Sequence, residues 1–269
     1  MLEHILKNIQ ISIPFKLLKD KYMPLVLENR VNPEIGIDGG VIDTYSRTDF
    51  SEIVSVLRRE GLSITLHGPF YDLVPGGMDK SMVKATRERL RQVFDLIPLF
   101  EPSFIVCHTG YDKNRYNKIR NEWVETSVET WSPLVEDLKG TQTILLFENV
   151  YERTPDMLNR LLCRLDSEKV GFCFDAGHMT AFSETAVEDW LKAMGPFLKE
   201  VHLHDNDGTW DDHLAIGAGE IDFDILFKYL EDNHLRPIIT LEAHVKGWIW
   251  QSVEALSKSD CFRRIVQTS

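Results

Sequence analysis

The segment QTILLFENVYERTPDMLNRLLCRLDSEKVGFCFDAG, residues 142–177, holds two short apolar runs with an amphipathic run between them. The outer runs, 142–149 and 169–177, have the length and the apolar composition that are typical of buried strands. The middle run offers Thr154 as an N-cap and Pro155 as the first helical residue, and apolar residues follow at helical spacing. The segment therefore predicts a strand, a helix and a second, parallel strand.

The same alternation extends over the whole chain. Candidate strands cover residues 8–14, 34–40, 62–68, 103–110, 142–149, 169–177, 199–205 and 237–243. Helix-like segments cover residues 15–29, 49–60, 79–98, 118–139, 154–166, 184–195, 222–234 and 249–267. Eight strand–helix units predict an α/β fold, a single (β/α)8 TIM barrel domain spanning residues 1–269. The alternative, a doubly wound open sheet, lacks the GxGxxG sequence after the first strand.

The composition limits the class of protein. The chain has 269 residues, of which 43% are hydrophobic, and it has no run of eighteen or more apolar residues that would predict a membrane-spanning helix. Residues 1–16 lack the long apolar stretch of a signal peptide. The cysteines show no CxxC spacing, so we expect reduced core thiols in a cytoplasmic protein: Cys107, Cys163, Cys173 and Cys261.

The charge argues against one class of partner. The formal net charge is −12, whereas tight binding of duplex nucleic acid usually needs clustered lysine and arginine. The one basic segment that stands out is KNRYNKIR, residues 113–120, and a solvated basic loop is its simplest interpretation. We therefore expect a small-molecule substrate, and neither a membrane nor duplex nucleic acid as a partner. The sequence leaves the oligomeric state open.

Side chains that can bind a metal recur at the ends of the candidate strands. Successive side chains of a strand face opposite sides, and the more polar side should point into the barrel, which places His202 and His204 inward and Val201 and Leu203 outward. Ionisable residues near the strand ends or just beyond them are His67, His108, Glu148, Asp175, His178, His202, His204, Asp211, His213 and Glu242. Active sites of TIM barrels lie at this end of the strands.

Each of these residues alone has an ordinary structural explanation, as a rim hydrogen-bonding group, a helix cap or an ion-pair partner. Together they do not, because several carboxylates in one barrel mouth repel one another, and burying them ionised is costly. Histidine with carboxylate is the ligand mixture of zinc, manganese and iron sites. The set therefore predicts a site for one to three divalent metal ions.

At these motifs the sequence resembles the xylose isomerase-like TIM barrels, including the endonuclease IV family. The resemblance rests on LHGPF (66–70), CHTG (107–110), FENV (147–150), FDAGH (174–178), VHLHD (201–205), DDHLAIGAGEID (211–222) and LEAH (241–244). It implies three ion sites: the first of His67, His108 and Glu148; the second of Glu148, Asp175, His202 and Glu242; the third of His178, Asp211 and His213. Asp212 competes with Asp211, but the Asp-x-His spacing favours Asp211.

Two reactions follow from the resemblance. The first is hydrolysis of a phosphodiester, and it is favoured because all positions of a three-metal site are filled. Given the negative charge, a small nucleotide-like substrate fits better than DNA, and the nucleotide loop of a cobamide is one example found in this superfamily. The second is isomerisation or epimerisation of a sugar or sugar phosphate, in which Glu148 and Glu242 form the acid/base pair and His178 contacts the substrate. A barrel that binds metal without activity is the third, less favoured alternative.

Other residues near the strand ends are candidates for contacts to the substrate. His204 lies where the family pattern does not demand histidine, which suggests a supporting or substrate-binding role. Aromatic residues in the strand-end loops could stack on a flat group, or they could pack the loops against the barrel rim. The residues expected to bind substrate are His204, Phe70, Tyr111, Trp210 and Lys246.

Overall fold

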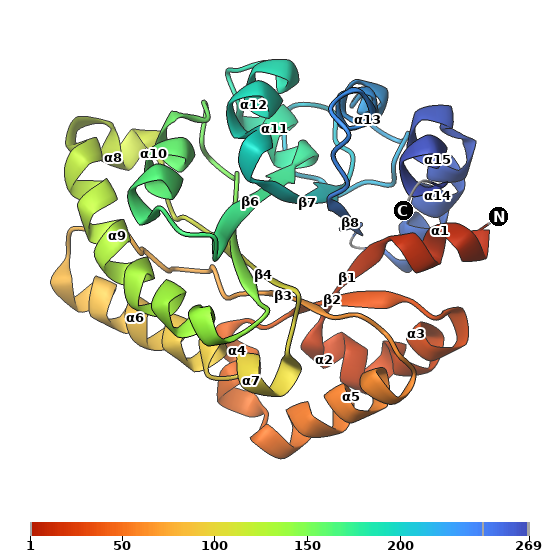
Figure 1. Cartoon of the computed structure of the whole chain (residues 1–269), viewed down its shortest axis with the longest axis horizontal. Helices are drawn as coiled ribbons and strands as arrows, with labels where there is room; N and C mark the ends of the chain where they lie inside the picture. The colour runs from red at the N-terminus through yellow and green to blue at the C-terminus, as the bar shows by residue number, and fades with distance from the viewer. Residues whose placement is uncertain (1, 244, 268–269) are drawn as a thin grey trace.

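Eight parallel strands form a closed barrel in the computed structural model, which describes residues 2–243 and 245–267 (Figure 1). They pair in chain order, and β1 also pairs with β8. The strands are β1 (Gln10–Pro14), β2 (Asn32–Gly36), β3 (Thr65–His67), β4 (Phe104–His108), β5 (Ile144–Glu148), β6 (Val170–Asp175), β7 (Leu198–Leu203) and β8 (Ile238–Leu241). The predicted TIM barrel is confirmed, and the open sheet is excluded because the sheet has no free edge.

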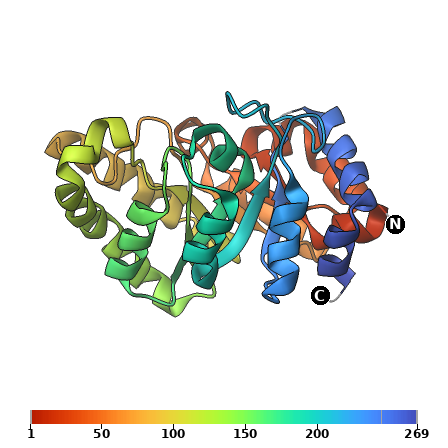
Figure 2. The same ribbon diagram turned by 90° about the horizontal axis from the view of Figure 1, so that it is seen from above.

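Helices surround the barrel on the outside (Figures 1 and 2). The longer ones are α5 (Arg47–Arg59), α6 (Lys80–Phe94), α9 (Arg120–Asp137), α10 (Asp156–Leu165), α13 (Phe223–Asp232) and α14 (Lys246–Lys258). The shorter α-helices are α1 (Leu2–Asn8), α2 (Phe15–Leu17), α3 (Met23–Asn29), α4 (Gly39–Thr44), α7 (Ile97–Phe100), α8 (Lys113–Tyr116), α11 (Ala176–Phe182), α12 (Val187–Met194) and α15 (Asp260–Gln267). One π-helical turn, η1 (Leu18–Tyr22), and three 3-10 turns, η2 (Asn117–Ile119), η3 (Leu138–Gly140) and η4 (Gly195–Phe197), complete the set.

Local sequence sets where these helices begin. Ser46 and Asp49 form a reciprocal capping box at the start of α5, which satisfies backbone N–H groups that the helix leaves free. The predicted start of α10 is wrong by one residue: Asp156 is the first helical residue, and Pro155 takes the N-cap position without a side-chain hydrogen bond. Thr154 therefore does not cap this helix.

Two separate packing regions fill the space on either side of the strands. Outward side chains such as Leu145 and Phe147 pack into the large core beneath the helices. Inward side chains of β4, β5 and β6 form a small apolar cluster of Val106, Leu146 and Cys173 inside the barrel. On the other side of the interior, β1, β2, β3, β7 and β8 place buried polar groups: Gln10, Glu34, Thr65, Glu200, His202 and Thr240. The predicted inward direction of His202 is confirmed.

The cysteine prediction is only partly right. Cys107 and Cys173 are buried, but Cys163 is exposed on α10 and Cys261 is partly exposed on α15, so these two are not core thiols. All four are free. Among the residues that the structure describes, none of the helices combines the length and apolar composition needed to span a bilayer.

Candidate metal centre

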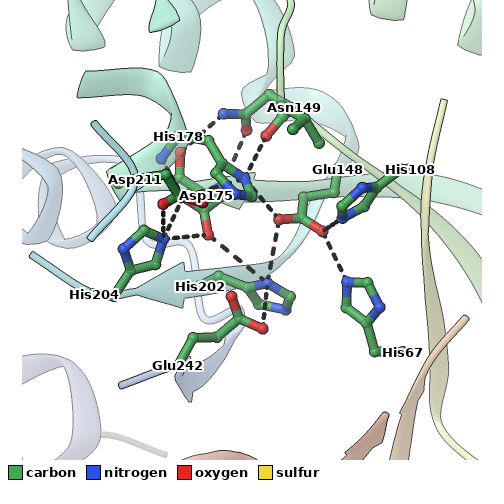
Figure 3. A network of polar contacts seen from close by, with 12 residues as sticks. His67, His108, Glu148, Asn149, Asp175, His178, His202, His204, Asp211 and Glu242 are labelled. Atoms are coloured by element: carbon green, nitrogen blue, oxygen red, sulfur yellow. Dashed lines mark hydrogen bonds and ion pairs between the residues drawn. The ribbon is translucent and has the colours of Figure 1, made fainter. Parts of the chain in front are cut away.

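The ends of strands β3 to β8 bring histidine and carboxylate side chains into one group (Figure 3). The parallel register places the end of each strand beside the end of the next, as with His108 beside Glu148 and Asp175 beside His202. Among the described residues, four subsets have ligand atoms within 4.8 Å of one another; the fourth, Glu34, Glu200 and His202, lies deeper in the barrel, and the other three include every residue for which the sequence predicts a metal ligand. We call these other three the first, second and third cluster.

The first cluster joins the ends of β3, β4 and β5. The Oε2 atom of Glu148 lies 3.1 Å from Nε2 of His67 and 3.1 Å from Nε2 of His108. Glu148 is fully buried, and Phe70 stacks on the His108 ring with the ring centroids 4.4 Å apart. Two imidazole nitrogens therefore converge on one oxygen of a buried carboxylate.

The second cluster contains Glu148, Asp175, His202 and Glu242. The Nδ1 atom of His202 lies 3.6 Å from Oε1 of Glu148, 4.0 Å from Oδ2 of Asp175 and 3.4 Å from Oε1 of Glu242. Glu148 therefore directs its two oxygens to two different clusters. Three carboxylates around one imidazole are a high density of negative charge for a buried site.

The third cluster contains His178, His204, Asp211 and His213. The Oδ2 atom of Asp211 lies 3.2 Å from Nε2 of both His178 and His213. His204 and His213 stack with their ring centroids 3.8 Å apart. The structure thus brings Asp211 into the site, whereas Asp212 is exposed, in agreement with the Asp-x-His spacing.

Most of these histidines have one ring nitrogen held by a partner outside the cluster. Nδ1 of His67 lies 3.0 Å from the Gly68 carbonyl oxygen, Nδ1 of His178 lies 3.1 Å from that of Asn149, and Nδ1 of His213 lies 2.8 Å from that of Glu242. Each carbonyl accepts a ring N–H from Nδ1, so Nε2 is the nitrogen that would bind a cation in the cluster once it loses its proton. Metal-bound histidines are usually oriented in this way.

The charge balance of the clusters also fits a cation. Burial lowers the pKa of His67, but the neighbouring Glu148 carboxylate raises it more, to about 9. Burial likewise raises the pKa of Glu148, but His108 and His202 outweigh it and hold that pKa well below its ordinary value. Four buried atoms in the clusters have no hydrogen-bond partner: Glu148 Oε1, His202 Nδ1, His204 Nδ1 and Asp211 Oδ1. Divalent ions would bind three of these atoms, Glu148 Oε1, His202 Nδ1 and Asp211 Oδ1. The donor set is that of zinc, manganese or iron.

A matching family model covers most of the chain, residues 34–261, and is described as "Xylose isomerase-like TIM barrel". The chain belongs to the xylose isomerase-like TIM barrel family. An uncharacterized protein of Methanocaldococcus jannaschii is 29% identical over 191 residues, which cover 68% of this chain and 65% of that protein. A protein of Mycobacterium marinum named "Probable endonuclease 4" is 25% identical over 183 residues, covering 65% of this chain and 71% of that protein.

A solved structure shares the fold over nearly the whole chain. The crystal structure of a D-tagatose 3-epimerase-like protein superposes with a TM-score of 0.80 at 24% identity, covering 97% of this chain and 99% of that one. At this level of identity the likeness shows the fold, and the chemistry of this xylose isomerase-like barrel has to be argued from its own site.

Of the five residues predicted to bind substrate, three line a cavity in this barrel and two do not. Phe70, Tyr111 and Lys246 line a cavity of about 1450 Å³ that also contains cluster residues. His204 is fully buried within the third cluster and does not belong to the cavity wall, because Asp175 and Asp211 lie against its Nε2 atom. Trp210 is 66% exposed, contacts Phe182 and lies outside the cavity lining. The structure therefore does not support these two as substrate contacts.

Two buried glutamates beneath the second cluster were missed by the sequence analysis. Glu34 on β2 and Glu200 on β7 are fully buried and face His202 inside the barrel. Burial and the neighbouring Glu34 raise the pKa of Glu200 to about 8, so it is mainly protonated at neutral pH. Strand alternation could have found Glu200, because it lies two residues before His202 on the inward face.

Asp205 is a third missed residue, and it holds the loop that carries the third cluster. Its Oδ2 atom accepts hydrogen bonds from the backbone N–H groups of Gly217 (2.8 Å) and Gly219 (3.0 Å). Its Oδ1 atom accepts from those of Asn206 (2.9 Å) and Ile221 (3.2 Å). The loop that it fixes supplies Asp211 and His213, so the Asp of VHLHD acts on the site through the backbone and is not a ligand.

Proposed function

We propose that the protein is a divalent-metal-dependent phosphodiester hydrolase that acts on a small, nucleotide-like substrate. The observation that carries this proposal is the position of the Glu148 carboxylate. Its Oε2 atom lies 3.1 Å from the two imidazoles of the first cluster, and its Oε1 atom faces His202 of the second. A carboxylate so placed could bridge two adjacent ions, which is the arrangement that hydrolysis of a phosphodiester uses.

The third cluster supports the same conclusion. Its four residues contribute nothing to a one-metal site made of Glu148, Asp175, His202 and Glu242, yet they are closely packed around Asp211. An isomerase of this family needs a single ion, so two further ligand clusters have no evident purpose in that reaction. A phosphate bound by three cations would use the residues of all three clusters.

Divalent ions in the clusters would lower the pKa of a bound water and stabilise negative charge on the phosphate oxygens. The protein's own part is to hold the ligands. The carbonyls of Gly68, Asn149 and Glu242 orient the imidazole rings. No side-chain nucleophile is required, so Glu148 and Glu242 serve as ligands in this reaction.

The surface charge favours a small substrate over duplex nucleic acid. Within the basic segment 113–120, Lys113 pairs with Glu184 at 2.9 Å and Arg120 lies 3.8 Å from Asp156, so acidic neighbours offset these charges. A net charge of −12 also opposes binding to a polyanion. A small phosphodiester, such as the nucleotide loop of a cobamide, needs only local charge compensation.

The second candidate function is isomerisation or epimerisation of a sugar or sugar phosphate. It is favoured by the second cluster alone, in which Glu148 and Glu242 flank His202 at 3.6 and 3.4 Å. In that reaction the two glutamates would move a proton beside a polarised carbonyl, and His178, which also lines the cavity, would contact the substrate. The first and third clusters would then be polar pocket lining.

Activity measurements on the metal-loaded protein distinguish the two functions. The substrates are bis(p-nitrophenyl) phosphate and a set of ketohexoses, with wild type compared with His67→Ala and His108→Ala. For the hydrolase, we expect phosphodiester cleavage that both substitutions reduce by at least a hundredfold. Ketose epimerisation that survives both substitutions, without cleavage of the phosphodiester, would contradict the proposal and support the alternative.

A further inference from the structure

The cavity at the barrel mouth has two halves with different chemistry. One half contains the cluster residues from β3 to β8, among them His67, His108 and Glu148. The other half lies over β1 and β2, which contribute no residue to the three clusters. Both halves form one continuous space of about 1450 Å³, so a ligand bound at the metal centre has access to the second half.

The wall of this second half is mainly apolar; its polar side chains are Ser12, Asp38 and Lys246. Leu17, Tyr22, Leu25 and Val26 line it from the α2–α3 segment, and Ile249 and Trp250 line it from α14. Asp38 is the acidic side chain on this part of the wall, and its carboxylate caps α4 by accepting a hydrogen bond from the Val41 N–H at 2.7 Å. The wall therefore presents apolar surface next to a strongly polar centre.

Exposed apolar side chains gather at the rim of the same cavity. Leu17 is 40% exposed, Tyr71 74%, Met82 51% and Tyr151 55%, and all four line it. Single exposed apolar residues are ordinary on a protein surface, but a group of them around one cavity marks a binding site for an apolar group. Positive charge on the lining is sparse and comes from Arg115 and Lys246 together with the histidines.

The cavity has more room than a single sugar ring would fill. Pockets for drug-sized ligands commonly measure about 300–1,000 Å³, and this cavity exceeds that range. We propose that the half over β1 and β2 is a subsite for an extended apolar or aromatic body carried on one ester arm of the substrate. The substrate class is then a phosphodiester with one bulky hydrophobic arm, and this inference rests on the proposed hydrolase function for the identity of the head group only.

The test measures binding without turnover. Metal-loaded protein is titrated in a calorimeter with phenylphosphonate, biphenylphosphonate and methylphosphonate, which share one anionic head and cannot be hydrolysed. We expect biphenylphosphonate to bind at least tenfold more tightly than methylphosphonate, because an apolar body leaves water on binding. Equal affinities for the three anions would overturn the subsite.

Substitutions test where the apolar subsite lies. Leu17→Gln and Leu25→Gln change exposed or partly exposed side chains of the α2–α3 wall, so both variants should fold, and each should reduce the biphenyl-to-methyl preference at least threefold. Ile225→Gln is the matched control, because Ile225 on α13 is 37% exposed and lies outside the cavity lining. If Leu17→Gln and Leu25→Gln leave the preference unchanged, or Ile225→Gln lowers it equally, the subsite does not lie where we place it.

The outcomes for the subsite and for the function are separate. A protein that prefers biphenylphosphonate but cleaves no phosphodiester retains the apolar subsite and loses the hydrolase function. A protein that cleaves bis(p-nitrophenyl) phosphate but binds the three phosphonates equally retains the function and loses the subsite.

Discussion

The Oε2 atom of Glu34 lies 3.2 Å from Nε2 of His202, and both side chains are fully buried inside the barrel. The other ring nitrogen, Nδ1, faces the carboxylates of Glu148 and Glu242. A carboxylate that accepts the Nε2–H fixes the tautomer and leaves the Nδ1 lone pair for a cation. Glu34 is therefore expected to act on the metal centre through His202.

Replacement of Glu34 tests this relationship. We expect Glu34→Gln to weaken binding of zinc at the second cluster by about tenfold or more, because the amide accepts a weaker hydrogen bond and lowers the basicity of the ring. The measurement is competition with a chromophoric chelator at neutral pH. Glu200→Gln is the control: Glu200 is mainly protonated there, with a pKa of about 8, so its amide variant changes the charge little. Equal effects of the two substitutions would contradict the special role of Glu34.

The fold was accessible from the sequence because it depends on a repeated local pattern. Each strand–helix unit carries its own periodicity, and the parallel connection requires the strand ends to meet at one face. His67, Glu148 and Asp175 were therefore predicted to lie together although they are far apart in the chain. Boundaries such as the start of α10 were missed because backbone geometry around Pro155, and not the nearest polar residue, sets the first turn.

The supporting residues were harder to predict because their roles depend on contacts between distant segments. Asp205 was read as part of a ligand motif, and only the folded loop shows that backbone N–H groups occupy its carboxylate. His204 and Trp210 have opposite environments, one fully buried and one exposed, that strand and loop positions alone do not reveal. Glu34 needs the barrel to close before it meets His202, from 168 residues away.

Loss of the Asp205 carboxylate should affect one cluster selectively. Asp205→Asn replaces one carboxylate oxygen with an NH2 group, so two of the four backbone N–H groups lose their acceptor, and we expect the loop with Asp211 and His213 to loosen. The bound metal should fall by about one ion per chain, measured by elemental analysis after gel filtration. Asp207→Asn is the control in the same loop, because the Asp207 carboxylate is exposed and caps only Thr209. Unchanged metal content in Asp205→Asn would contradict the role of the carboxylate.

Gly177 offers an independent perturbation of the third cluster. A Cβ atom at this position would overlap the His204 ring, with Cε1 as its nearest atom. Gly177→Ala should therefore displace His204 and lower both the melting temperature and the metal content. Gly140→Ala is the matched control, since a Cβ there meets nothing within 4 Å. Wild-type melting and metal content in Gly177→Ala would show that the cluster tolerates displacement of this ring.

As the pH rises, the metal-free form should lose stability while the stabilisation gained from bound metal should grow. Burial lowers the pKa values of His67 and His213, but their carboxylate neighbours raise both to about 9, above the ordinary 6.5. Protonation of these rings therefore stabilises the metal-free fold fully below about pH 6.5, and that contribution is lost as the pH rises through 9. A cation needs the deprotonated rings, so its affinity should rise over the same interval.

Thermal melting between pH 6.5 and 9 checks this expectation. With chelator, the melting temperature should fall as the pH rises; with saturating zinc, the increase in melting temperature over the chelated protein should grow. A zinc-induced increase that shrinks toward pH 9 would mean that no protons leave the rings when the metal binds.

The measurement that tests the central claim most directly is anomalous X-ray diffraction at the zinc edge from crystals of the zinc-loaded protein, combined with elemental analysis. We expect about three ions per chain, two of them sharing the Glu148 carboxylate and the third bound by His178, Asp211 and His213. Crystals saturated with zinc that show no anomalous peak within bonding distance of Glu148, Asp175, His202 and Glu242 would contradict it.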